Sequence, residues 1–479
     1  MAEPLEQLRK IRISKLAALR QLGIDAYPAK CSRKQTIAQA RQKMGKTVMI
    51  AGRLRAKRGH GGIQFFDLED ESGKIQLVFK KEELKAKDLK LLALLDIGDF
   101  VEVWGGVFQT QAGEISVLVK FLKLLTKSLR PLPSKWYGLK DEEERLRRRY
   151  LDLIFNPELH EVFRKKALFW NTMRSFLLEK GFLEVETPVL EVTAGGADAN
   201  PFITHHDALD CDVYLRISMG ELWQKRLMVA GFEKTFEIGR QFRNEGLSKE
   251  HLQDYTQMEF YWAYADYEDG MKLVEEMYRE VIEKTFGTLK FEIFGFKIDF
   301  GKPWSRIDYR EAVLKKFKIE VNKTNLAEVK KKLDQLKVDY DKKASLGRLI
   351  DCLWKEARKD ISGPAFLVGH PVLVSPLAKR VVNKPTQTQR FQVIIAGSEV
   401  GNGYSELNDP LDQAERFLGQ AKMRAAGDKL AQMYDTDFVE ALEFGMPPTC
   451  GFGVSERLFS FLMNRPIREC VLFPLMKPR

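Results

Sequence analysis

The chain has 479 residues, of which 44% are hydrophobic and 30% charged, a composition typical of a globular protein with about two to four domains. No run of about 18 apolar residues occurs, which excludes a membrane-spanning helix, and five scattered cysteines without a CxxC pair argue against a disulfide framework or a zinc site. The net charge of +11 favours a polyanionic partner such as nucleic acid, because binding it releases counterions.

Residues 1–46 are predicted to form a helical extension. Apolar residues recur at helical spacing along residues 4–45, with lysines and arginines between them; they are Leu8, Ile11, Leu16, Leu19 and Leu22. The basic face is either simply solvated or a contact for a nucleic-acid backbone. The segment has no apolar core of a signal peptide, so we expect a cytoplasmic protein.

Residues 47–127 change to short strands separated by turns that contain glycine. A helix-like stretch, EELKAKDLKLLALL, lies between the third and fourth of five predicted strands. This order fits an OB-fold barrel, which binds single-stranded nucleic acid through aromatic stacking and basic groups. The candidate binding residues are Arg58, Phe65 and Gln76. Because side chains alternate along a strand, only one of Phe65 and Phe66 can face the barrel core.

Residues 128–150 contain two prolines and then a dense charge run, which predicts an interdomain linker that enters a helix. From 151 to 479 helical and strand patterns alternate. They include a long amphipathic helix ended by Gly181, a strand ending at Pro188 and a helical or insertion region at about 286–360. We therefore expect an α+β protein in which a barrel precedes a larger domain.

The stretch 236–262 combines two strands of alternating polarity with a polar connection. The apolar face of the second strand carries Met258 and Phe260, and the polar face carries Glu259 and Tyr261. Charged and aromatic polar side chains gather in the connection, at Arg243, Glu245, His251 and Tyr255. Folding alone does not require this concentration of groups, whereas a site for a phosphate and a charged amino acid does.

Two further clusters show the same chemistry. Asn402, Tyr404 and Glu406 are spaced i, i+2, i+4 and so share one strand face, just after Glu399. The segment GFGVSERLF predicts a strand, a turn and a helix. Its Arg457 falls in the first helical turn, where the partial positive charge of the helix favours phosphate.

The amino-acid sequence of these motifs resembles that of the class II aminoacyl-tRNA synthetases, and most of all that of the bacterial-type lysyl-tRNA synthetases. The similarity covers nearly the whole chain and rests on the order and spacing of ETPVLEVTAGGADANPFITHH, DVYLRIS, KRLMVAGFEKTFEIGRQFRNEG, MEFYWAYADY, HPVLVSPLAK, GNGYSELNDPLDQAERF and MPPTCGFG. The resemblance implies a catalytic domain on an antiparallel sheet flanked by helices. It also implies that L-lysine is activated with ATP to lysyl-adenylate and transferred to the 3′ end of lysine tRNA.

The resemblance implies roles for individual residues as well. Arg243 would hold the lysine carboxylate and the α-phosphate of ATP, and it would be catalytic together with Arg457. The positions implied for ATP are Arg243, Glu245, His251, Tyr255, Glu399, Gly453 and Arg457, with Tyr255 stacked on adenine and both His251 and Arg457 on the β- and γ-phosphate side. The positions implied for lysine are Gly196, Glu221, Glu259, Tyr261, Asn402, Tyr404 and Glu406, with the Gly196 backbone and Glu221 on the α-amino group. The positions implied for the anticodon are Arg58, Phe65 and Gln76.

Mg²⁺ is the implied cofactor, with Glu399 as its main protein ligand. The sequence departs from the family pattern here, because Gln392 stands where a glutamate is usual and offers only a neutral carbonyl. We therefore expect fewer bound ions than usual. RISMGELW is one residue longer and GFGVSER one residue shorter than the common forms, and LQD replaces the common polar triplet after His251. These departures indicate a divergent branch.

The resemblance further implies a homodimer whose interface includes the helix 162–180 and the following FLEVETPVL. The apolar residues of that stretch could equally be core; they are Phe169, Trp170, Met173, Phe176, Leu177 and Phe182. Three alternatives to lysine activation are a synthetase for aspartate or asparagine, a relative that modifies a protein lysine, and a non-catalytic binding protein. A synthetase for aspartate or asparagine would require cationic groups in the amino-acid pocket. A relative that modifies a protein lysine would lack the barrel, and a non-catalytic protein would have lost Arg243 or Arg457.

Overall fold

The structure is a computed structural model that describes residues 5–60, 62–132, 141–246, 248, 250–342 and 344–478. The chain forms two compact units, Met1–Lys140 and Asp141–Arg479, each of which is described by itself. Part of the predicted linker 128–150, residues 133–140, lies outside the described residues. No helix in the described part of the chain is long and apolar enough to cross a membrane.

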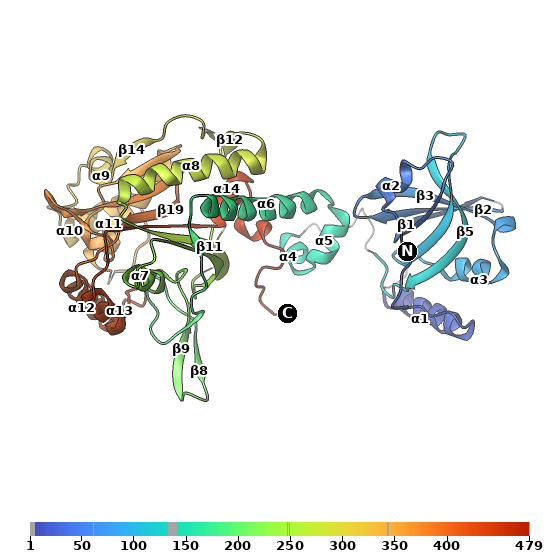
Figure 1. Ribbon diagram of the computed structural model, residues 1–479, viewed down its shortest axis with the longest axis horizontal. Coiled ribbons are helices and arrows are strands. Elements are labelled where there is room, and N and C mark those ends of the chain that lie inside the picture. Colours follow the sequence, from blue (N-terminus) through green and yellow to red (C-terminus); the bar gives the residue numbers. More distant parts are fainter. Residues whose placement is uncertain are drawn as a thin grey trace. The chain divides into compact units, whose positions relative to one another are not determined.

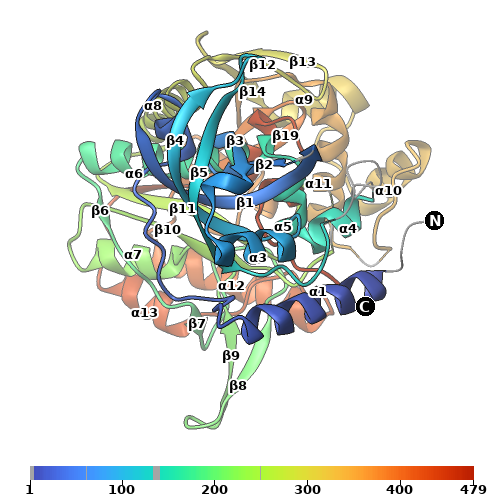
Figure 2. The same ribbon diagram turned by 90° about the vertical axis from the view of Figure 1, so that its right-hand side faces the viewer.

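The first unit contains a closed five-stranded barrel with the strand order β1-β2-β3-β5-β4 (Figure 2). The elements are β1 (Thr47–His60), β2 (Ile63–Asp70), β3 (Gly73–Lys80), α3 (Ala86–Leu94), β4 (Phe100–Gln109) and β5 (Ile115–Thr126). The helix between the third and fourth strands and the closed barrel confirm the predicted OB fold. Phe66 is 1% exposed and packs in the barrel core, whereas the neighbouring Phe65 remains partly exposed.

The N-terminal extension is helical only in part. Irregular chain separates α1 (Leu5–Gln21) from α2 (Ile37–Arg41), so the prediction of a helix over residues 4–45 is wrong. Gly23, with a left-handed φ of 64°, follows α1, and a capping box at Thr36 begins α2. The predicted apolar face of α1 is interrupted too, because Ile11 is 40% exposed while Arg12 is buried.

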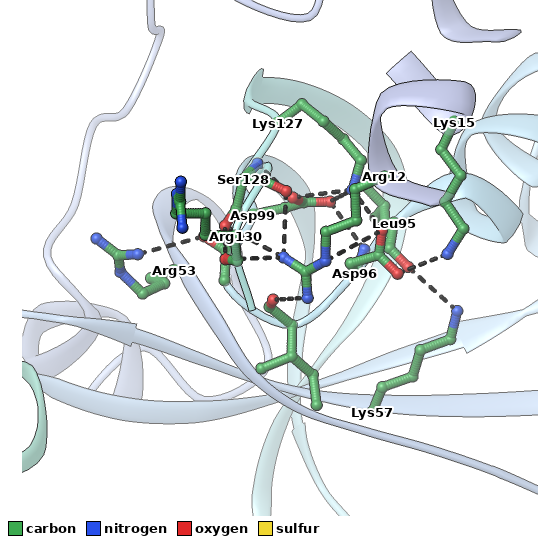
Figure 3. Close-up of polar contacts among 12 residues, drawn as sticks. Arg12, Lys15, Arg53, Lys57, Leu95, Asp96, Asp99, Lys127, Ser128 and Arg130 are labelled. Carbon is green, nitrogen blue, oxygen red and sulfur yellow. Dashed lines mark hydrogen bonds and ion pairs between the residues drawn. The ribbon is translucent and has the colours of Figure 1, made fainter. Parts of the chain in front are cut away.

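A buried polar cluster joins α1 to the end of β5 (Figure 3). The guanidinium of Arg12 donates hydrogen bonds to the carbonyl oxygens of Ile97 (2.9 Å) and Ser128 (3.1 Å). Beside it, the buried ammonium of Lys127 lies 2.8 Å from Asp99 and 2.6 Å from Asp96. Asp96 also pairs with Lys15 of α1 at 2.5 Å, so this cluster and the Arg12 hydrogen bonds together hold α1 against the barrel.

The second unit is built on an eight-stranded sheet with the order β14-β15-β18-β19-β20-β11-β10-β6. Neighbouring strands are antiparallel except for the pairs β14–β15 and β10–β6, which are parallel. The strands are β6 (Leu183–Glu184), β10 (Lys234–Phe242), β11 (Asp254–Ala263), β14 (Ser305–Asp308), β15 (Ala365–Val368), β18 (Arg390–Ile395), β19 (Ser398–Ser405) and β20 (Thr449–Ser455). This sheet agrees with the expected α+β catalytic domain.

Helices lie on both faces of this sheet. Figure 1 shows α6 (Glu158–Glu179) and α8 (Tyr267–Phe286) along one face, and α7 (Glu221–Val229) and α13 (Thr436–Glu443) on the opposite side. Phe236, Phe260 and Phe452 belong to the hydrophobic core between the sheet and α6 and α8. The unit also contains α4 (Glu142–Arg147), α5 (Arg149–Phe155), α12 (Pro410–Ala425) and α14 (Arg457–Leu462).

Two predicted segments differ from the structure. The strand expected to end at Pro188 is only the two-residue β6, and the chain then enters β7 (Leu190–Glu191) of a separate small sheet with β8 (Ile203–His206) and β9 (Cys211–Leu215). Proline cannot donate a ladder hydrogen bond, which accounts for this interruption. The region 286–360 contains strands as well as helices: β12 (Lys290–Ile293), β13 (Phe296–Asp299), β14, α9 (Tyr309–Phe317), α10 (Leu326–Gln335) and α11 (Leu346–Ala357). A short hairpin, β16 (Arg380–Val381) with β17 (Lys384–Thr388), completes the unit.

Candidate active site

A cavity of about 1010 Å³ lies in the second unit. Its walls include all of the residues that the sequence predicts for ATP and lysine: Gly196, Glu221, Arg243, Glu245, His251, Tyr255, Glu259, Tyr261, Glu399, Asn402, Tyr404, Glu406, Gly453 and Arg457. The structure thus gathers residues from separate segments of the chain into one space. Their individual roles stay predictions.

Strand alternation explains how the side chains reach this cavity. Along β11, Met258 and Phe260 are buried in the core, whereas Gln257, Glu259 and Tyr261 line the cavity on the other face. The pairing of β18 with β19 shifts register between Gln392 and Ile394, which is a bulge.

Glycines make room on the opposite face of β19 and beside Glu221. A Cβ at Gly401 would come within 2.7 Å of Phe452, and one at Gly403 within 2.6 Å of Phe391, so larger residues would clash there. Gly196 has a left-handed φ of 84°, and a Cβ there would lie 2.8 Å from the Cβ of Glu221. Only glycine therefore lets the backbone approach Glu221 so closely.

Neutral donors surround Glu259 at the closed end of the cavity. Its carboxylate accepts hydrogen bonds from the Met219 N–H (3.1 Å), the Tyr261 hydroxyl (3.1 Å) and the Gln257 amide (2.5 Å). Among the described residues no cation forms an ion pair with it. Burial and the nearby charge of Glu221 raise the pKa of Glu259 to about 7. A cation brought by a ligand would find an unmatched carboxylate here.

Glu221 and Glu406 meet at a lysine of the chain itself. The Lys225 ammonium lies 2.7 Å from the Glu221 carboxylate and 2.5 Å from that of Glu406. The Tyr404 hydroxyl donates a further short hydrogen bond to Glu221. Sequence analysis missed Lys225. The i,i+4 spacing from Glu221 on a helix was a signal for the first contact, but the second depends on the tertiary fold.

Guanidinium groups dominate the other end of the cavity. Arg243 donates to the Ile217 carbonyl (3.2 Å) and lies 5.8 Å from the ring centre of Tyr255, and no carboxylate pairs with it within the described ranges. Arg457 forms a short ion pair with Glu250, a residue that the sequence analysis did not single out. The Ser398 hydroxyl also donates to Glu250, at 3.2 Å.

His251 lies near Arg457 in this part of the cavity. Its Nδ1 is 2.8 Å from the Ser248 hydroxyl. Desolvation and the positive charge of Arg457 lower the pKa of His251, so the imidazole is predominantly neutral near pH 7. A neutral imidazole can donate a hydrogen bond to a phosphate without adding a charge.

Glu399 is held in place by neighbours that leave part of its carboxylate available. The Trp354 indole donates to its Oε1 (2.6 Å), and Arg358 lies 3.8 Å from the same atom. Although burial acts in the opposite direction, Arg358 and Trp354 lower the pKa of Glu399, which keeps it ionised. Gln392 is paired instead with the imidazole of His370 at 2.9 Å. Burial lowers the pKa of His370 to about 3, so this pair is neutral.

Glu399 and Gln392 fit a metal ion that is held mainly by substrate phosphates, and do not fit an ion enclosed by protein side chains alone. Across the residues that the structure describes, no group of three or more His, Cys, Asp or Glu side chains could enclose an ion. Mg²⁺, however, usually binds through one or two carboxylates together with substrate phosphates. Glu399 fits that arrangement, and the neutral Gln392 would add at most a carbonyl.

Asn402 and Tyr255 are positioned by further residues that the sequence did not indicate. The guanidinium of Arg390 donates to the Asn402 side-chain oxygen at 2.8 Å. The Gln241 amide donates a short hydrogen bond to the Tyr255 hydroxyl.

The three residues predicted for nucleic-acid contact share one outward face of the barrel. Arg58 is opposite Phe65 in the β1–β2 pair, and Gln76 is opposite Asp67 in the β2–β3 pair. Arg58 also forms a 2.6 Å ion pair with Asp67. The structure thus places a cation, an aromatic ring and an amide on one face of the barrel, and their contact with nucleic acid stays a prediction.

Comparison with known proteins agrees with both units. The family model for tRNA synthetases class II (D, K and N) matches residues 141–477, and that for the OB-fold nucleic acid binding domain matches residues 48–125. The lysine–tRNA ligase of Carboxydothermus hydrogenoformans is 46% identical over 100% of this chain and 99% of its own. Those of Syntrophomonas wolfei and Thermotoga maritima are 44% and 43% identical, each over 99% of this chain and 98% and 97% of theirs.

Proposed function

Since the chain belongs to the class II tRNA synthetases of the D, K and N group and matches lysine–tRNA ligases over its full length, we propose that it is an ATP-dependent lysine–tRNA ligase. It activates L-lysine with ATP to lysyl-adenylate and transfers lysine to the 3′ end of lysine tRNA. One observation carries the assignment of the amino acid. Three buried carboxylates, Glu221, Glu259 and Glu406, line the closed end of the cavity, where an aspartate or asparagine enzyme would need cationic groups.

The activation step needs positioning more than acid–base chemistry. A carboxylate oxygen of lysine attacks the α-phosphorus of ATP, a new oxygen–phosphorus bond forms, and the bond to the β-phosphate oxygen breaks to release pyrophosphate. Arg243 stabilises the negative charge on the α-phosphate and holds the lysine carboxylate in line. Its guanidinium has no carboxylate partner among the described residues, which supports this role. In the second step a hydroxyl at the tRNA 3′ end attacks the lysyl carbonyl, and AMP leaves.

The two amino groups of lysine are bound by different carboxylates. Glu221 and the backbone at Gly196 hold the α-amino group, and the close approach at Gly196 supports this assignment. Glu259 and Glu406 converge on the ε-ammonium, with Tyr261 hydrogen-bonded to Glu259. Asn402 and Tyr404 form the remaining walls. A buried charge is unfavourable without a partner, so a neutral amino acid would leave Glu259 unmatched.

ATP occupies the part of the cavity that is rich in guanidinium groups. Arg457 and His251 contact the β- and γ-phosphates, the ring of Tyr255 stacks on adenine, and Glu245 and Gly453 complete the nucleotide contacts. Mg²⁺ bound by Glu399 and the phosphates would neutralise charge on the leaving pyrophosphate. With neutral Gln392 nearby, we propose fewer ions than a pair of carboxylates would hold.

The barrel recognises the anticodon of the tRNA. Phe65 stacks on a base while Arg58 and Gln76 contact its neighbours, and we propose a uracil-rich anticodon as the target. Since tRNA charging supplies cytoplasmic protein synthesis, the proposed location is the cytoplasm.

The proposed assembly is a homodimer. The six apolar residues first considered for the interface, Phe169, Trp170, Met173, Phe176, Leu177 and Phe182, are buried in the core of the unit itself. The proposal rests instead on exposed apolar residues nearby, Leu178, Leu183, Leu190 and Val192. β6 is also an edge strand of the sheet, and an open edge favours contact with another chain.

Pyrophosphate exchange with each of the twenty amino acids tests the function directly. Lysine should support exchange, and aspartate and asparagine should not. Transfer of labelled lysine to total tRNA then tests the second step. Exchange with aspartate or asparagine, or none with any amino acid, would overturn the assignment.

A further inference from the structure

Lys225 lies among the carboxylates Glu221 and Glu406 at the end of the cavity proposed to bind lysine, which we call the amino-acid end. It is not one of the groups assigned to a substrate. It is 1% exposed and comes from α7, one helical turn after Glu221. Its ammonium contacts Glu221 at 2.7 Å and Glu406 at 2.5 Å, and the rings of Tyr404 and Phe438 pack 5.4 Å and 5.9 Å away. Burial alone would lower the pKa of Lys225, but the two carboxylates raise it, so the side chain is charged.

The orientation of Glu406 shows that Lys225 uses only part of that carboxylate. The Oε2 atom of Glu406 faces Lys225, whereas its Oε1 atom lies over Gly451, where an added Cβ would come within 2.2 Å. Tyr261 lies against the same glycine. One oxygen of Glu406 therefore stays directed along the wall of the cavity while the other is fixed by the ammonium.

Beside α7 one further buried carboxylate, Glu191, accepts a hydrogen bond from the Trp223 indole at 2.9 Å and does not line the cavity. Toward α13, Arg226 pairs with Asp435 at 3.0 Å, and toward β10, Arg216 pairs with Glu237 at 2.6 Å. Lys225 faces Glu221 on its own helix, Tyr404 on β19 and Glu406 just after β19, while Glu259 and Tyr261 of β11 line the same cavity. This end of the cavity thus holds three carboxylates and, among the described residues, one ammonium.

We infer that Lys225 is a fixed counter-cation that leaves the charge of two carboxylates for the substrate, and so makes the pocket specific for an amino acid with two ammonium groups. The inference rests on the proposed function. Three carboxylates minus Lys225 give a charge of −2, and the α- and ε-ammonium groups of lysine supply +2. The lysine carboxylate is matched separately by Arg243. The filled pocket is then neutral, which a closed, weakly hydrated space requires.

Neutralising substitutions test this balance, because charge and packing predict different outcomes. Lys225→Met keeps the length of the side chain, and Glu406→Gln keeps its shape. Glu406→Gln alone leaves two carboxylates facing three ammonium groups once lysine binds, so the lysine KM in pyrophosphate exchange should rise about 100-fold or more. Adding Lys225→Met to this variant leaves two carboxylates facing two ammonium groups, and should lower the lysine KM again by about tenfold. The ATP KM of all three variants reports on intact folding and should change little.

The outcomes separate the inference from the function on which it rests. A double variant whose lysine KM is no better than that of Glu406→Gln overturns the role of Lys225, while the unmodified protein still activates lysine. An unmodified protein that does not activate lysine overturns the proposed function instead.

Discussion

The two ends of the catalytic cavity are built from opposite charges and at different depths. At the amino-acid end Glu221, Glu259 and Glu406 are only 6%, 5% and 2% exposed, and the chain supplies their hydrogen-bond donors in advance. At the phosphate end, by contrast, Arg243, Glu250 and Arg457 are all partly exposed. The buried end can discriminate, because an unmatched charge there cannot be solvated by water. The open end can admit ATP and release pyrophosphate.

The two ends also differ in what occupies their charged groups before a ligand arrives. Lys225 is a permanent partner for Glu221 and Glu406, since it is enclosed by the fold. Glu250, by contrast, pairs with Arg457 from the partly exposed connection between β10 and β11. A phosphate can displace such a carboxylate, whereas Lys225 is 1% exposed and is held by both Glu221 and Glu406. The contrast predicts that substitutions at one end leave the other substrate largely unaffected.

The largest effect is expected at the phosphate end, from Glu399→Ala. Loss of the main proposed Mg²⁺ ligand should lower pyrophosphate exchange by about two orders of magnitude or more, because metal stabilisation of the transferring phosphate contributes several kcal/mol. The lysine affinity, measured by calorimetry without ATP, should stay the same. The variant should also need more Mg²⁺ to reach half-maximal exchange. An unchanged exchange rate and Mg²⁺ requirement would refute the role of Glu399.

Phe65→Ala should act outside the cavity altogether. Stacking on a base contributes about 1–3 kcal/mol, so the KM for tRNA in the charging reaction should rise about fivefold to 100-fold. Pyrophosphate exchange, which needs no tRNA, should be unaffected. Phe121→Ala is the matched control, since Phe121 is an exposed phenylalanine on β5 of the same barrel. Equal losses in both reactions, or equal effects of both variants, would contradict anticodon binding by this face.

Lysine affinity should depend on pH through Glu259. Its pKa of about 7 in the empty pocket is above the usual range, so the carboxyl is largely protonated below pH 7 and cannot pair with an ammonium. The lysine KM should fall about tenfold for each unit as pH rises toward 7, and level off above it. In Glu259→Gln this dependence should weaken and leave only the contribution of Glu406, whose pKa is also raised by burial. A flat profile in the unmodified protein would show that Glu259 is already ionised when the pocket is empty.

The smallest effect is expected from Glu250→Gln. Removing the charge that competes for Arg457 should lower the ATP KM by about 1.4-fold to fivefold, since partly exposed ion pairs contribute about 0.2–1 kcal/mol. The lysine KM should not change. A higher ATP KM would mean that Glu250 supports nucleotide binding and does not compete with it.

The sequence predicted the polar face of β11 well, because strand alternation assigns Glu259 and Tyr261 to one side from spacing alone. It also predicted the barrel, whose turns and short strands have local signatures. The prediction that residues 4–45 are helical was right only for α1 and α2, because the helix ends before Gly23, whose φ is left-handed. Within α1, tertiary contacts bury Arg12 in place of Ile11. Residues that complete the site from distant elements could not be predicted. Trp354 on α11 reaches Glu399 on β19, and no local pattern encodes a contact between them.

The most direct test of the account compares lysine with norleucine, which has the same carbon chain but lacks the ε-amine. A site built around a buried polar group typically rejects an analogue without its partner by about 10⁴–10⁵ in kcat/KM. In pyrophosphate exchange the unmodified protein should prefer lysine over norleucine by a ratio of that size. Glu259→Gln should reduce this ratio of kcat/KM values to a small fraction of the ratio in the unmodified protein. Glu233→Gln, at an exposed glutamate just before β10, should leave the ratio unchanged. A ratio below about tenfold in the unmodified protein, or the same ratio in Glu259→Gln, would contradict selection by the buried carboxylates.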